Sequence, residues 1–488
     1  VGGEVGGEAG GELAGGGYEW GGASCEAEYG RLRVGSPGSP WRLCALNEGY
    51  ALCASYPRVL AVPSALSDEV IRRAADFRSG KRLPALCWKM PTGTAALCRS
   101  SQPKVGVAMA RSAHDEQLLQ AIADANPSAE RLMIVDCRPR VNAELNHAKG
   151  KGYEHTTLQY RMARLTFAGV ENIHVVRASL KHFLQLLRQA HGAGAPHMAR
   201  VGAPLQGAPP PPSDPASPSA APVEPADTAA LSAANANGKL ERSGWLEHLR
   251  SILKGAGHVA HLIAVEGVSV LVHCSDGWDR TPQLTALAQL LLDPLFRTRR
   301  GFATLVEKEW LAFGHQFALR CGTVGPLEQE ASSPADDQLS PVFVQFVDCV
   351  WQLLQQAPHA FEFNGRYLAT LLYHTTSCQY STFLCDCERQ RTQLRLAGRA
   401  RPVWDALAGD EMRNSSYRPT NEVLTPDVGP HALRPWTSFY CRSEGLLVAS
   451  VAAGSTKADG SKPDARRGKT TGRIKVMLRR KSSLNANV

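Results

Sequence analysis

The chain has 488 residues, 43% of them hydrophobic and 20% charged, which is enough for one large domain or two ordinary domains with a buried core. Its formal net charge is +9, but residues 457–488 contain ten Lys and Arg side chains against two Asp, so this tail carries nearly all of the excess. A nucleic-acid binder with a basic folded face is therefore excluded, because the rest of the chain is close to neutral.

Cysteine usage and the length of apolar runs indicate the compartment. The 13 cysteines are an odd number and lack the dense, regular spacing of a disulfide framework, which favours a reducing compartment. No apolar run approaches the roughly 18 residues of a membrane span, and the first residues are Gly and Glu rather than a basic head followed by an apolar stretch. The sequence as given predicts neither a transmembrane helix nor a signal peptide.

Three low-complexity segments divide the chain. Residues 1–17 are rich in Gly and are expected to be disordered, because ordering Gly costs much backbone entropy. Residues 191–238 are rich in Ala, Pro, Ser and Gly, which predicts a disordered surface insertion inside a folded domain. Residues 447–488 form a basic tail that we also expect to be disordered, although its mixed apolar and basic run 474–481 equally suits an anionic membrane surface.

Strand-like and helix-like patterns alternate between these segments. Ser112 with Asp115 three residues later predicts a helix N-terminus. Short apolar runs predict strands at residues 83–88, 131–136, 173–176 and 268–273. Helical spacing predicts helices at residues 284–292, 302–320, 341–356 and 361–375. The expected fold class is α/β, with a central sheet flanked by many helices.

The most informative stretch is residues 268–284, in which an apolar strand ends at His273 and a helix begins with Pro282 in its first turn. Between them, Cys274 and Arg280 lie six residues apart. Backbone N–H groups of residues 275–280 can converge on phosphate oxygens at the positive end of the helix, while the guanidinium of Arg280 binds two oxygens. We refer to residues 274–280 as the 274–280 loop.

The same electrostatic field would lower the pKa of the Cys274 thiol from a free value of about 8.5 and supply a thiolate at neutral pH. A thiolate that attacks phosphorus forms a cysteinyl-phosphate, which water then hydrolyses. The spacing alone is a weak signal, because Cys25 to Arg31 and Cys385 to Arg391 share it. Neither of these has an apolar strand before it and an apolar helix after it, so the sequence favours the 274–280 loop.

Two carboxylates in the loop, Asp276 and Asp279, need an explanation, because an anion site gains nothing from negative charge. One explanation is that at least one of them is protonated when substrate binds and donates its proton to the leaving alkoxide. The chain has no Trp-Pro-Asp sequence, which carries the acid in tyrosine phosphatases, and this supports the explanation. The alternative is that either Asp accepts hydrogen bonds from loop N–H groups and holds the loop in shape.

Residues 273–281 resemble the active-site signature of the myotubularin family of phosphoinositide 3-phosphatases, and similarity to the family extends over roughly residues 18–442. Further motifs in the family's order are residues 41–44, 47–53, 55–57, 77–79, 82–88, 101–103, 138–142, 152–154, 171–177, 308–310, 313–315, 340–341, 345–351 and 360–363.

The resemblance implies a fold like that of protein tyrosine phosphatases. It also implies an enzyme that removes the 3-phosphate from phosphatidylinositol 3-phosphate and from phosphatidylinositol 3,5-bisphosphate, without a metal or a cofactor. By matching position, Cys274 would be the nucleophile and Arg280 the phosphate clamp, with Asp279 preferred over Asp276 as general acid. The residues expected to contact the phosphate or the headgroup are Ser275, Asp276, Gly277, Trp278, Asp279, Arg280, Asn146, Asn172 and Gln316.

The sequence departs from the family pattern at three places. Only residues 18–47 resemble the end of the family's lipid-binding PH-GRAM domain, so the expected phosphatase domain is residues 48–446. Gln316 replaces a residue that is commonly basic in the family and placed to meet the 5-phosphate. A charge-assisted contact of about 1.5–3 kcal/mol is then missing, which predicts a weakened preference for the bisphosphate. Pro282 replaces a small residue, which a first helical turn tolerates.

Two other functions stay open at this point, a protein tyrosine or dual-specificity phosphatase and an inactive phosphoinositide-binding scaffold. The resemblance implies a cytoplasmic protein, peripheral on endomembranes, whose partners are phosphoinositide lipids at a membrane surface and not nucleic acid. A homo- or hetero-oligomer with related phosphatases is left open.

Overall fold

The computed structural model describes residues 22–192, 240–323 and 335–442. The predicted disordered segment 1–17, nearly all of the insertion 191–238 and the basic tail lie outside the described residues. The described residues belong to one compact unit.

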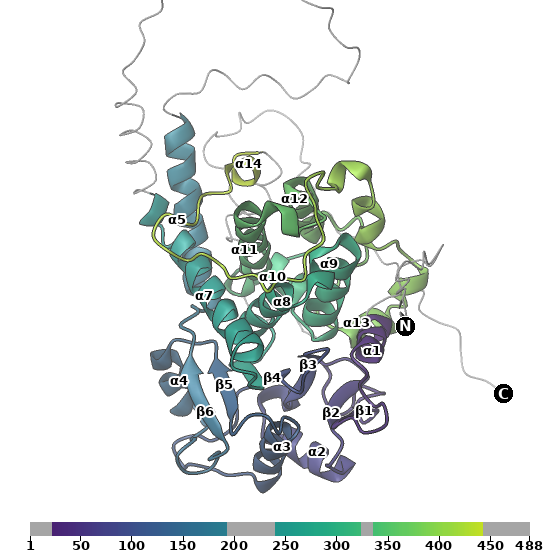
Figure 1. The fold of residues 1–488 in the computed structure, drawn as a ribbon. Helices are drawn as coiled ribbons and strands as arrows, with labels where there is room; N and C mark the ends of the chain where they lie inside the picture. The colour runs from purple at the N-terminus through teal and green to yellow at the C-terminus, as the bar shows by residue number, and fades with distance from the viewer. Residues whose placement is uncertain (1–21, 193–239, 324–334, 443–488) are drawn as a thin grey trace, which may run out of the picture. The chain divides into compact units, whose positions relative to one another are not determined.

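A five-stranded sheet lies at the centre of the fold (Figure 1). Its strands, in spatial order, are β3 (Ala85–Lys89), β4 (Ala96–Ser101), β7 (Val270–Cys274), β5 (Leu132–Asp136) and β6 (Ala163–Phe167). The edge strand β3 is antiparallel to β4, and the other neighbours are parallel. Strand β7 is the middle strand although it comes last in sequence, so its carboxyl end opens between those of β4 and β5, where open α/β sheets bind ligands.

A smaller sheet and the first helix pack against this core. Strands β1 (Trp41–Cys44) and β2 (Leu60–Pro63) form an antiparallel pair, and α1 is Gly22–Arg31. The hydroxyl of Tyr29 in α1 donates to the carbonyl of Leu86 in β3 at 3.0 Å, so α1 is joined to the edge of the central sheet. The described part of residues 18–47, the segment predicted to be a PH-GRAM remnant, therefore packs against the same core as the central sheet.

Helices cover both faces of the central sheet, with α2 and α3 on one side and α7, α8, α9, α11 and α12 gathered on the other (Figure 1). The predicted cap at Ser112 is confirmed, since its hydroxyl accepts from the N–H of Asp115 at 3.3 Å. Besides short 3-10 helices, the described ranges contain the π-helix η3 (Glu307–Ala312) and the α-helices α1, α2 (Asp68–Asp76), α3 (Ala113–Asp124), α4 (Arg140–His147), α5 (Ile173–Gly192), α7 (Trp245–Ala264), α8 (Arg280–Leu292), α9 (Arg299–Val306), α10 (Phe317–Cys321), α11 (Val342–Gln356), α12 (Gly365–Ser377), α13 (Glu388–Gln393) and α14 (Thr437–Tyr440).

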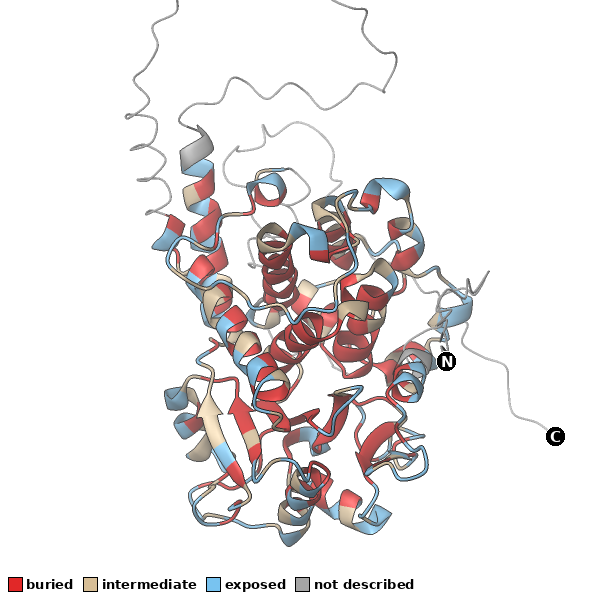
Figure 2. Ribbon diagram, viewed as in Figure 1, coloured by how far each residue is buried: buried red, intermediate tan, exposed pale blue. Residues whose placement is uncertain are grey.

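Helix α8, which begins at Arg280, is buried on every side from Thr281 to Leu292 (Figure 2). A helix without an exposed face must satisfy its polar side chains internally. The hydroxyl of Thr285 and the amide of Gln289 both donate to Glu309 of η3, at 2.7 and 2.8 Å. These bonds fix the rotation of α8 about its axis and therefore the orientation of its first residue, Arg280.

Two predicted elements differ from the structure. Residues 173–176 are the first turn of α5 and not a strand, because Asn172 caps the helix and Val176, Leu180 and Phe183 form its buried stripe. The β-branched residues of this turn gave the strand signal, and the actual strand is β6. The predicted helix 302–320 is divided into α9, η3 and α10, since Gly314 adopts a φ of +75° between the last two.

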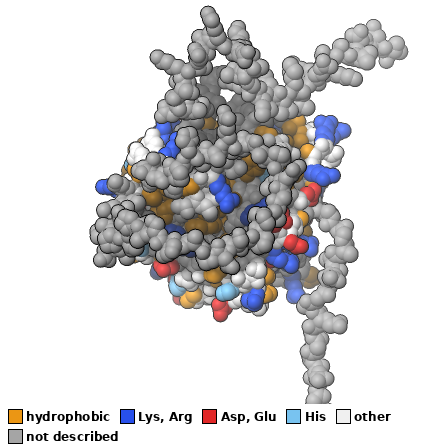
Figure 3. Space-filling view, turned by 90° about the horizontal axis from the view of Figure 1, so that it is seen from above, with side chains coloured by type: hydrophobic (Ala, Val, Ile, Leu, Met, Phe, Trp, Pro, Cys, Tyr) orange, Lys and Arg blue, Asp and Glu red, His pale blue; other side chains and the backbone are white. Residues whose placement is uncertain are grey.

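Acidic and basic side chains are interspersed on the described surface visible in Figure 3. Within the three described ranges, no helix has both the length and the apolar character needed to cross a membrane.

Candidate active site

The 274–280 loop lies at the carboxyl end of the central strand. Cys274 is the last residue of β7 and Arg280 the first of α8, so five residues connect the sheet to the helix. The N-terminus of α8 carries unpaired backbone N–H groups and the positive end of the helix dipole. The predicted strand, loop and helix are therefore confirmed, and together they form a site suited to an anion.

The Cys274 thiol lies in an environment that favours its ionised form. Its Sγ accepts hydrogen bonds from the N–H of Gly277 and from the hydroxyl of Thr281, both at 3.3 Å. Burial alone would raise the pKa of Cys274, but the charge of Arg280 and these two donors outweigh burial and lower it below its usual value. Cys274 can therefore act as a thiolate nucleophile.

Gly277 gives the loop its shape. Its φ is +78°, and a Cβ built on it would lie 2.4 Å from the carbonyl oxygen of Ser100 in β4. Its own carbonyl oxygen accepts from two buried guanidiniums, Nη2 of Arg82 at 2.9 Å and Nη2 of Arg99 at 2.8 Å. This carbonyl is consequently turned away from the anion site, while the Gly277 N–H is turned toward the thiol.

Arg280 has a free terminal nitrogen beside the loop. Its Nη2 donates to the hydroxyl of Ser275 at 3.2 Å, and its Nη1 is buried without a hydrogen-bond partner in the described part of the chain. Asn146 of α4 also reaches this hydroxyl, with Nδ2 to Oγ at 3.2 Å. The structure thus brings Cys274, Ser275, Arg280 and Asn146 together, as the sequence predicted. An unpaired buried N–H is costly unless a ligand satisfies it, which points to an anion between Cys274 and Arg280.

The two loop carboxylates occupy different environments. Asp279 is buried and forms a bidentate ion pair with Arg320 of α10, at 3.1 and 2.8 Å. Although burial alone would raise the pKa of Asp279, Arg320 and His315 lower it far below its usual range. A carboxyl that stays ionised has no proton to give, so the geometry does not favour the predicted role of Asp279 as general acid. Asp276 is partly exposed and near enough to Cys274 for its charge to act on the thiol.

Trp278 and His315 connect the loop to the segment before α10. The backbone carbonyl of Trp278 lies 2.7 Å from Nδ1 of His315, and the indole ring of Trp278 lies 5.5 Å from the guanidinium carbon of Arg82. Nε1 of Trp278 is buried without a partner among the described residues. His315 therefore supports the loop, and Trp278 offers a donor at its rim.

The other two predicted headgroup residues are less directly engaged. The side-chain oxygen of Asn172 accepts from the N–H groups of His174 and Val175, at 3.0 and 3.2 Å, and so caps α5. Only its amide nitrogen is left to meet a ligand. Gln316 is partly buried and follows His315 directly at the start of α10. Because His315 contacts Trp278 and Asp279, the backbone of the adjacent Gln316 lies close to the 274–280 loop.

Buried ion pairs hold the strand ends behind the loop. His273 contacts Glu154 at 2.9 Å, and Glu154 pairs with Arg78 at 2.6 Å. Arg138 pairs with Asp136 at the end of β5 at 2.6 Å. All of these side chains are fully buried, and breaking such a pair leaves an uncompensated charge. The network therefore fixes β5 and β7 at the point where they support the site.

Sequence reasoning missed several residues of this site. Thr281, which donates to the thiol, directly follows Arg280 and could have been recognised from that adjacency. Arg82 and Arg99 gave only a weak signal, a charged residue beside or within an apolar strand. Arg320 gave none, because it lies 41 residues from the Asp279 that it holds.

The two other Cys-x5-Arg segments have different surroundings. Cys25 lies in α1, where burial raises its pKa well above the usual value. Burial also raises the pKa of Cys385 to about 11. The sequence interpretation that singled out Cys274 agrees with this difference.

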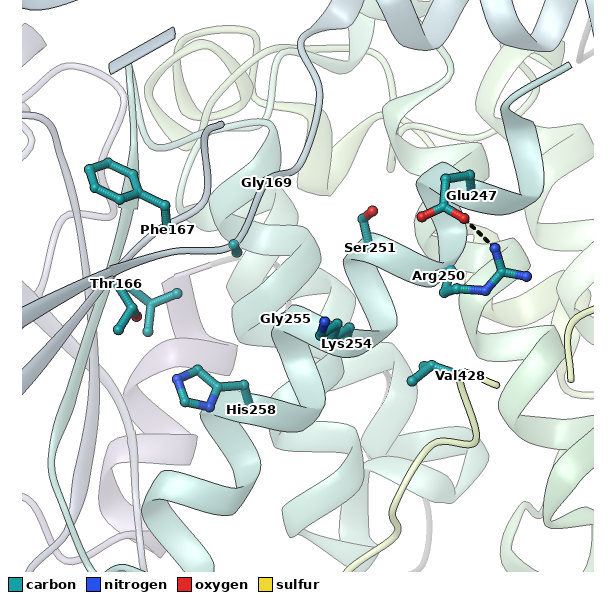
Figure 4. Close-up of a pocket in the computed structure, with 12 residues that line it drawn as sticks. Thr166, Phe167, Gly169, Glu247, Arg250, Ser251, Lys254, Gly255, His258 and Val428 are labelled. Carbon is teal, nitrogen blue, oxygen red and sulfur yellow. Dashed lines mark hydrogen bonds and ion pairs between the residues drawn. The ribbon is translucent and has the colours of Figure 1, made fainter. Parts of the chain in front are cut away.

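A separate pocket of about 450 Å³ lies between the ends of β5 and β6 and helix α7 (Figure 4). Lys254 and His258 of α7 line it together with Thr166 and Phe167, and the ion pair of Glu247 with Arg250 lies at its side. No residue of the 274–280 loop lines this pocket. We therefore do not assign the reaction to it, although it is large enough for a small ligand.

Comparison with known proteins agrees with this site. Residues 14–392 match the family model described as the myotubularin-like phosphatase domain. The chain is 40% identical to myotubularin of Rattus norvegicus over 413 residues, which cover 84% of this chain and 61% of that protein. It is 41% identical to phosphatidylinositol-3,5-bisphosphate 3-phosphatase MTMR2 of Bos taurus over 422 residues, covering 84% and 57%, respectively. It is 39% identical to phosphatidylinositol-3,5-bisphosphate 3-phosphatase MTMR6 of Mus musculus over 426 residues, covering 86% and 61%. The chain thus spans roughly three fifths of the length of these relatives.

Proposed function

Since this chain belongs to the myotubularin family, we propose that it is a phosphoinositide 3-phosphatase acting through a cysteinyl-phosphate at Cys274. The observation that carries the proposal is the Cys274 thiol, whose pKa is lowered beside Arg280, a residue with an unpaired buried nitrogen. The substrates are phosphatidylinositol 3-phosphate and the 3,5-bisphosphate. The names of MTMR2 and MTMR6 state the bisphosphate activity for those two relatives.

The first chemical step transfers the phosphoryl group to sulfur. The Cys274 thiolate attacks the D3 phosphorus, a sulfur–phosphorus bond forms, and the bond from phosphorus to the inositol oxygen breaks. Arg280 and the loop N–H groups bind the nonbridging oxygens as negative charge spreads over them. Asp276 is protonated when the dianionic phosphate binds beside it, and it gives this proton to the leaving inositol oxygen, because Asp279 is held ionised by Arg320.

The second step releases inorganic phosphate. Asp276, now ionised, removes a proton from water, which attacks phosphorus and displaces the Cys274 thiolate. The acid role can be tested with Asp276→Asn on two substrates. Turnover of the lipid should fall by about 10²–10⁴-fold, whereas an activated aryl phosphate, whose leaving group needs no proton, should lose far less. Equal losses on both substrates would exclude Asp276 as the acid.

The substrate proposal is tested by phosphate release from all singly and multiply phosphorylated inositol lipids and from a panel of phosphotyrosine peptides, with Cys274→Ser as the blank. We expect release only from lipids that carry a D3 phosphate. Comparable release from the peptides would instead support a tyrosine phosphatase, and no release from any substrate would support a scaffold.

Gln316 sets the expected ranking of the two lipids. A neutral amide close to the loop cannot supply the charge-assisted hydrogen bond that a 5-phosphate would accept from Arg, worth about 1.5–3 kcal/mol. Gln316→Arg should therefore raise the ratio of kcat/KM on the bisphosphate to that on the monophosphate by roughly tenfold or more. An unchanged ratio would remove Gln316 from the headgroup site.

The membrane surface is also part of the proposal. Because the substrates are lipids, the enzyme works as a peripheral protein on the cytoplasmic side of endomembranes. Association with itself or with related phosphatases is a separate part of the proposal. The basic tail, residues 457–488, is the candidate for electrostatic attraction to anionic lipids. Removing residues 452–488 should weaken vesicle binding and flatten its dependence on salt, and unchanged binding would exclude this role.

A further inference from the structure

A second buried cysteine, Cys137, lies directly beside the nucleophile. Strands β5 and β7 are parallel, with Asp136 opposite His273 in the register. The ladder continues one residue further, because the N–H of Cys137 donates to the carbonyl of His273 at 2.8 Å. Earlier in the same ladder, the N–H of Met133 donates to the carbonyl of Ser269, and Met133 is paired with Val270, the residue after Ser269. By the same rule, Cys137 is paired with the residue after His273. Cys137 therefore stands opposite Cys274.

This register brings the two side chains into reach of each other. Residues opposite each other on adjacent parallel strands project from the same face of the sheet, and their Cα atoms lie about 4.8 Å apart, the spacing of neighbouring strands. Disulfide-bonded cysteines usually have Cα atoms about 4.4–6.8 Å apart. Thr281 marks the shared space, since its hydroxyl bonds to Sγ of Cys274 at 3.3 Å and also interacts with the thiol of Cys137.

We propose that Cys137 is a resolving cysteine that captures oxidised Cys274 as a reversible disulfide and so protects the nucleophile. The oxidant is a hydroperoxide. The Cys274 thiolate attacks the terminal oxygen of the peroxide, the O–O bond breaks, and Cys274 becomes a sulfenic acid while alkoxide leaves, or hydroxide when the oxidant is hydrogen peroxide. The sulfur of Cys137 then attacks the sulfur of Cys274, an S–S bond forms, and the sulfenic oxygen leaves as water with the thiol proton. A dithiol reverses the two-electron oxidation.

The two thiols differ in the way that these steps require. The pKa of Cys274 is lowered, so it reacts first. Burial, the neighbouring Cys274 and Asp136 raise the pKa of Cys137, while Arg280 and the hydroxyl of Thr281 lower it. Conversion of Cys274 to a neutral sulfenic acid removes the Cys274 contribution, so Cys137 ionises more readily after its neighbour has been oxidised than before.

The experiment uses the full chain, oxidised with hydrogen peroxide, quenched with catalase and blocked with N-ethylmaleimide before trypsin digestion. Residues 132–140 and 255–280 are tryptic peptides that contain Cys137 and Cys274, respectively, as their single cysteines. We expect the two peptides to be linked in the wild type, with the link lost on treatment with dithiothreitol. Cys274 found as sulfinic or sulfonic acid without any link would overturn the proposal.

Cys137→Ala and Cys98→Ala form a matched pair, because both remove a fully buried thiol from the same sheet. After equal peroxide exposure, dithiothreitol should restore several-fold less activity in Cys137→Ala than in wild type or Cys98→Ala, because Cys274 becomes over-oxidised. Equal recovery in all three proteins would overturn the proposal. Cys137→Ser serves as the variant if Cys137→Ala does not fold.

The inference rests on the proposed function only in taking Cys274 as the reactive thiol. The peptide link is read by mass and needs no activity, and recovery can be measured with a soluble aryl phosphate. Failure of the lipid 3-phosphatase assay with a linked peptide present would contradict the substrate assignment alone. A missing link in an active lipid phosphatase would contradict the role of Cys137 alone.

Discussion

The 274–280 loop and residues 385–391 share the spacing Cys-x5-Arg, but their surroundings shift the pKa values of the two cysteines in opposite directions. Their exposure is similar, 2% for Cys274 and 5% for Cys385. The pKa of Cys274 is lowered, whereas burial raises that of Cys385 to about 11. The Cys-x5-Arg spacing alone therefore does not make a thiol reactive. The position of the segment in the fold does.

Two features separate the two segments. The first cysteine ends a central parallel strand and faces the start of the buried helix α8, whereas Cys385 follows no strand. Gly277 turns an N–H toward Sγ of Cys274, and residues 386–390 contain no Gly. The guanidinium does not separate the two segments, because Arg280 and Arg391 each have one buried nitrogen without a hydrogen-bond partner among the described residues, and each lowers the pKa of its cysteine. The reactive thiol thus depends on backbone donors as well as on a nearby cation.

The largest expected difference between the segments is in catalysis. Cys274→Ser should lower kcat on phosphatidylinositol 3-phosphate by roughly 10⁴-fold or more, the scale on which loss of a nucleophile acts in other hydrolases. Cys385→Ser, which changes a buried thiol of the same spacing, should keep kcat within a few-fold. Phosphate release from both variants measures this, and comparable losses would contradict the assignment of the nucleophile.

The role of Gly277 can be tested by adding one methyl group. Gly277→Ala forces a Cβ to 2.4 Å from the Ser100 carbonyl at a φ of +78°, and the backbone strain alone costs about 1–3 kcal/mol. We expect lower stability together with a loss of kcat that exceeds what the reduced folded fraction explains. Gly398→Ala is the control, because nothing lies within 4 Å of its added Cβ. Normal kcat in folded Gly277→Ala would show that the loop tolerates another shape.

Substitution of Asp279 and of Asp386, one from each segment, should change the free energy of unfolding by different amounts at neutral pH. Asp279→Asn leaves Arg320 buried and unpaired, which should lower the free energy of unfolding at pH 7 by about 3–5 kcal/mol. Because the pKa of Asp279 is lowered in the fold, its contribution is complete above the unfolded pKa of about 3.9 and is lost as the pH falls toward the folded value. The difference between variant and wild type should therefore shrink in acid.

Burial instead raises the pKa of Asp386, whose Oδ1 accepts from the N–H of Leu319 at 3.1 Å. Asp386→Asn keeps an oxygen acceptor and should change stability by less than about 1 kcal/mol at pH 7. Urea unfolding of both variants from pH 3 to pH 8 gives the comparison. Equal losses in the free energy of unfolding for Asp279→Asn and Asp386→Asn at neutral pH would mean that the ion pair with Arg320 adds no stability beyond that of a hydrogen-bonded carboxylate.

The smallest effect is the rate of thiol alkylation. At pH 6, Cys274 should react with iodoacetamide at least about tenfold faster than Cys385, because only the thiolate reacts. Peptide mapping after short exposures gives both rates from one sample, and bound inorganic phosphate should protect Cys274 alone. Equal rates would show that the field of the loop does not ionise Cys274.

The sequence was sufficient for the parts of the site that are contiguous. A strand, a loop with Cys and Arg at fixed spacing, and a helix with Pro in its first turn are read within residues 268–284, and each is present in the structure. The ion pair of Asp279 could not be predicted in the same way, because its partner Arg320 lies on another helix, 41 residues away in sequence. The strand predicted at residues 173–176 failed for a related reason, since the side-chain cap of Asn172 and tertiary packing outweighed β-branched propensity.

Trapping of the phosphoenzyme tests the central claim most directly. Phosphatidylinositol 3-phosphate labelled in its D3 phosphate is mixed with the enzyme and quenched in acid within milliseconds, and the labelled peptide is then identified. We predict label on the peptide 255–280 at Cys274, none on peptides that contain Cys25 or Cys385, and none in Cys274→Ser. Full phosphate release with no label on Cys274, or label on either of the other cysteines, would contradict the account.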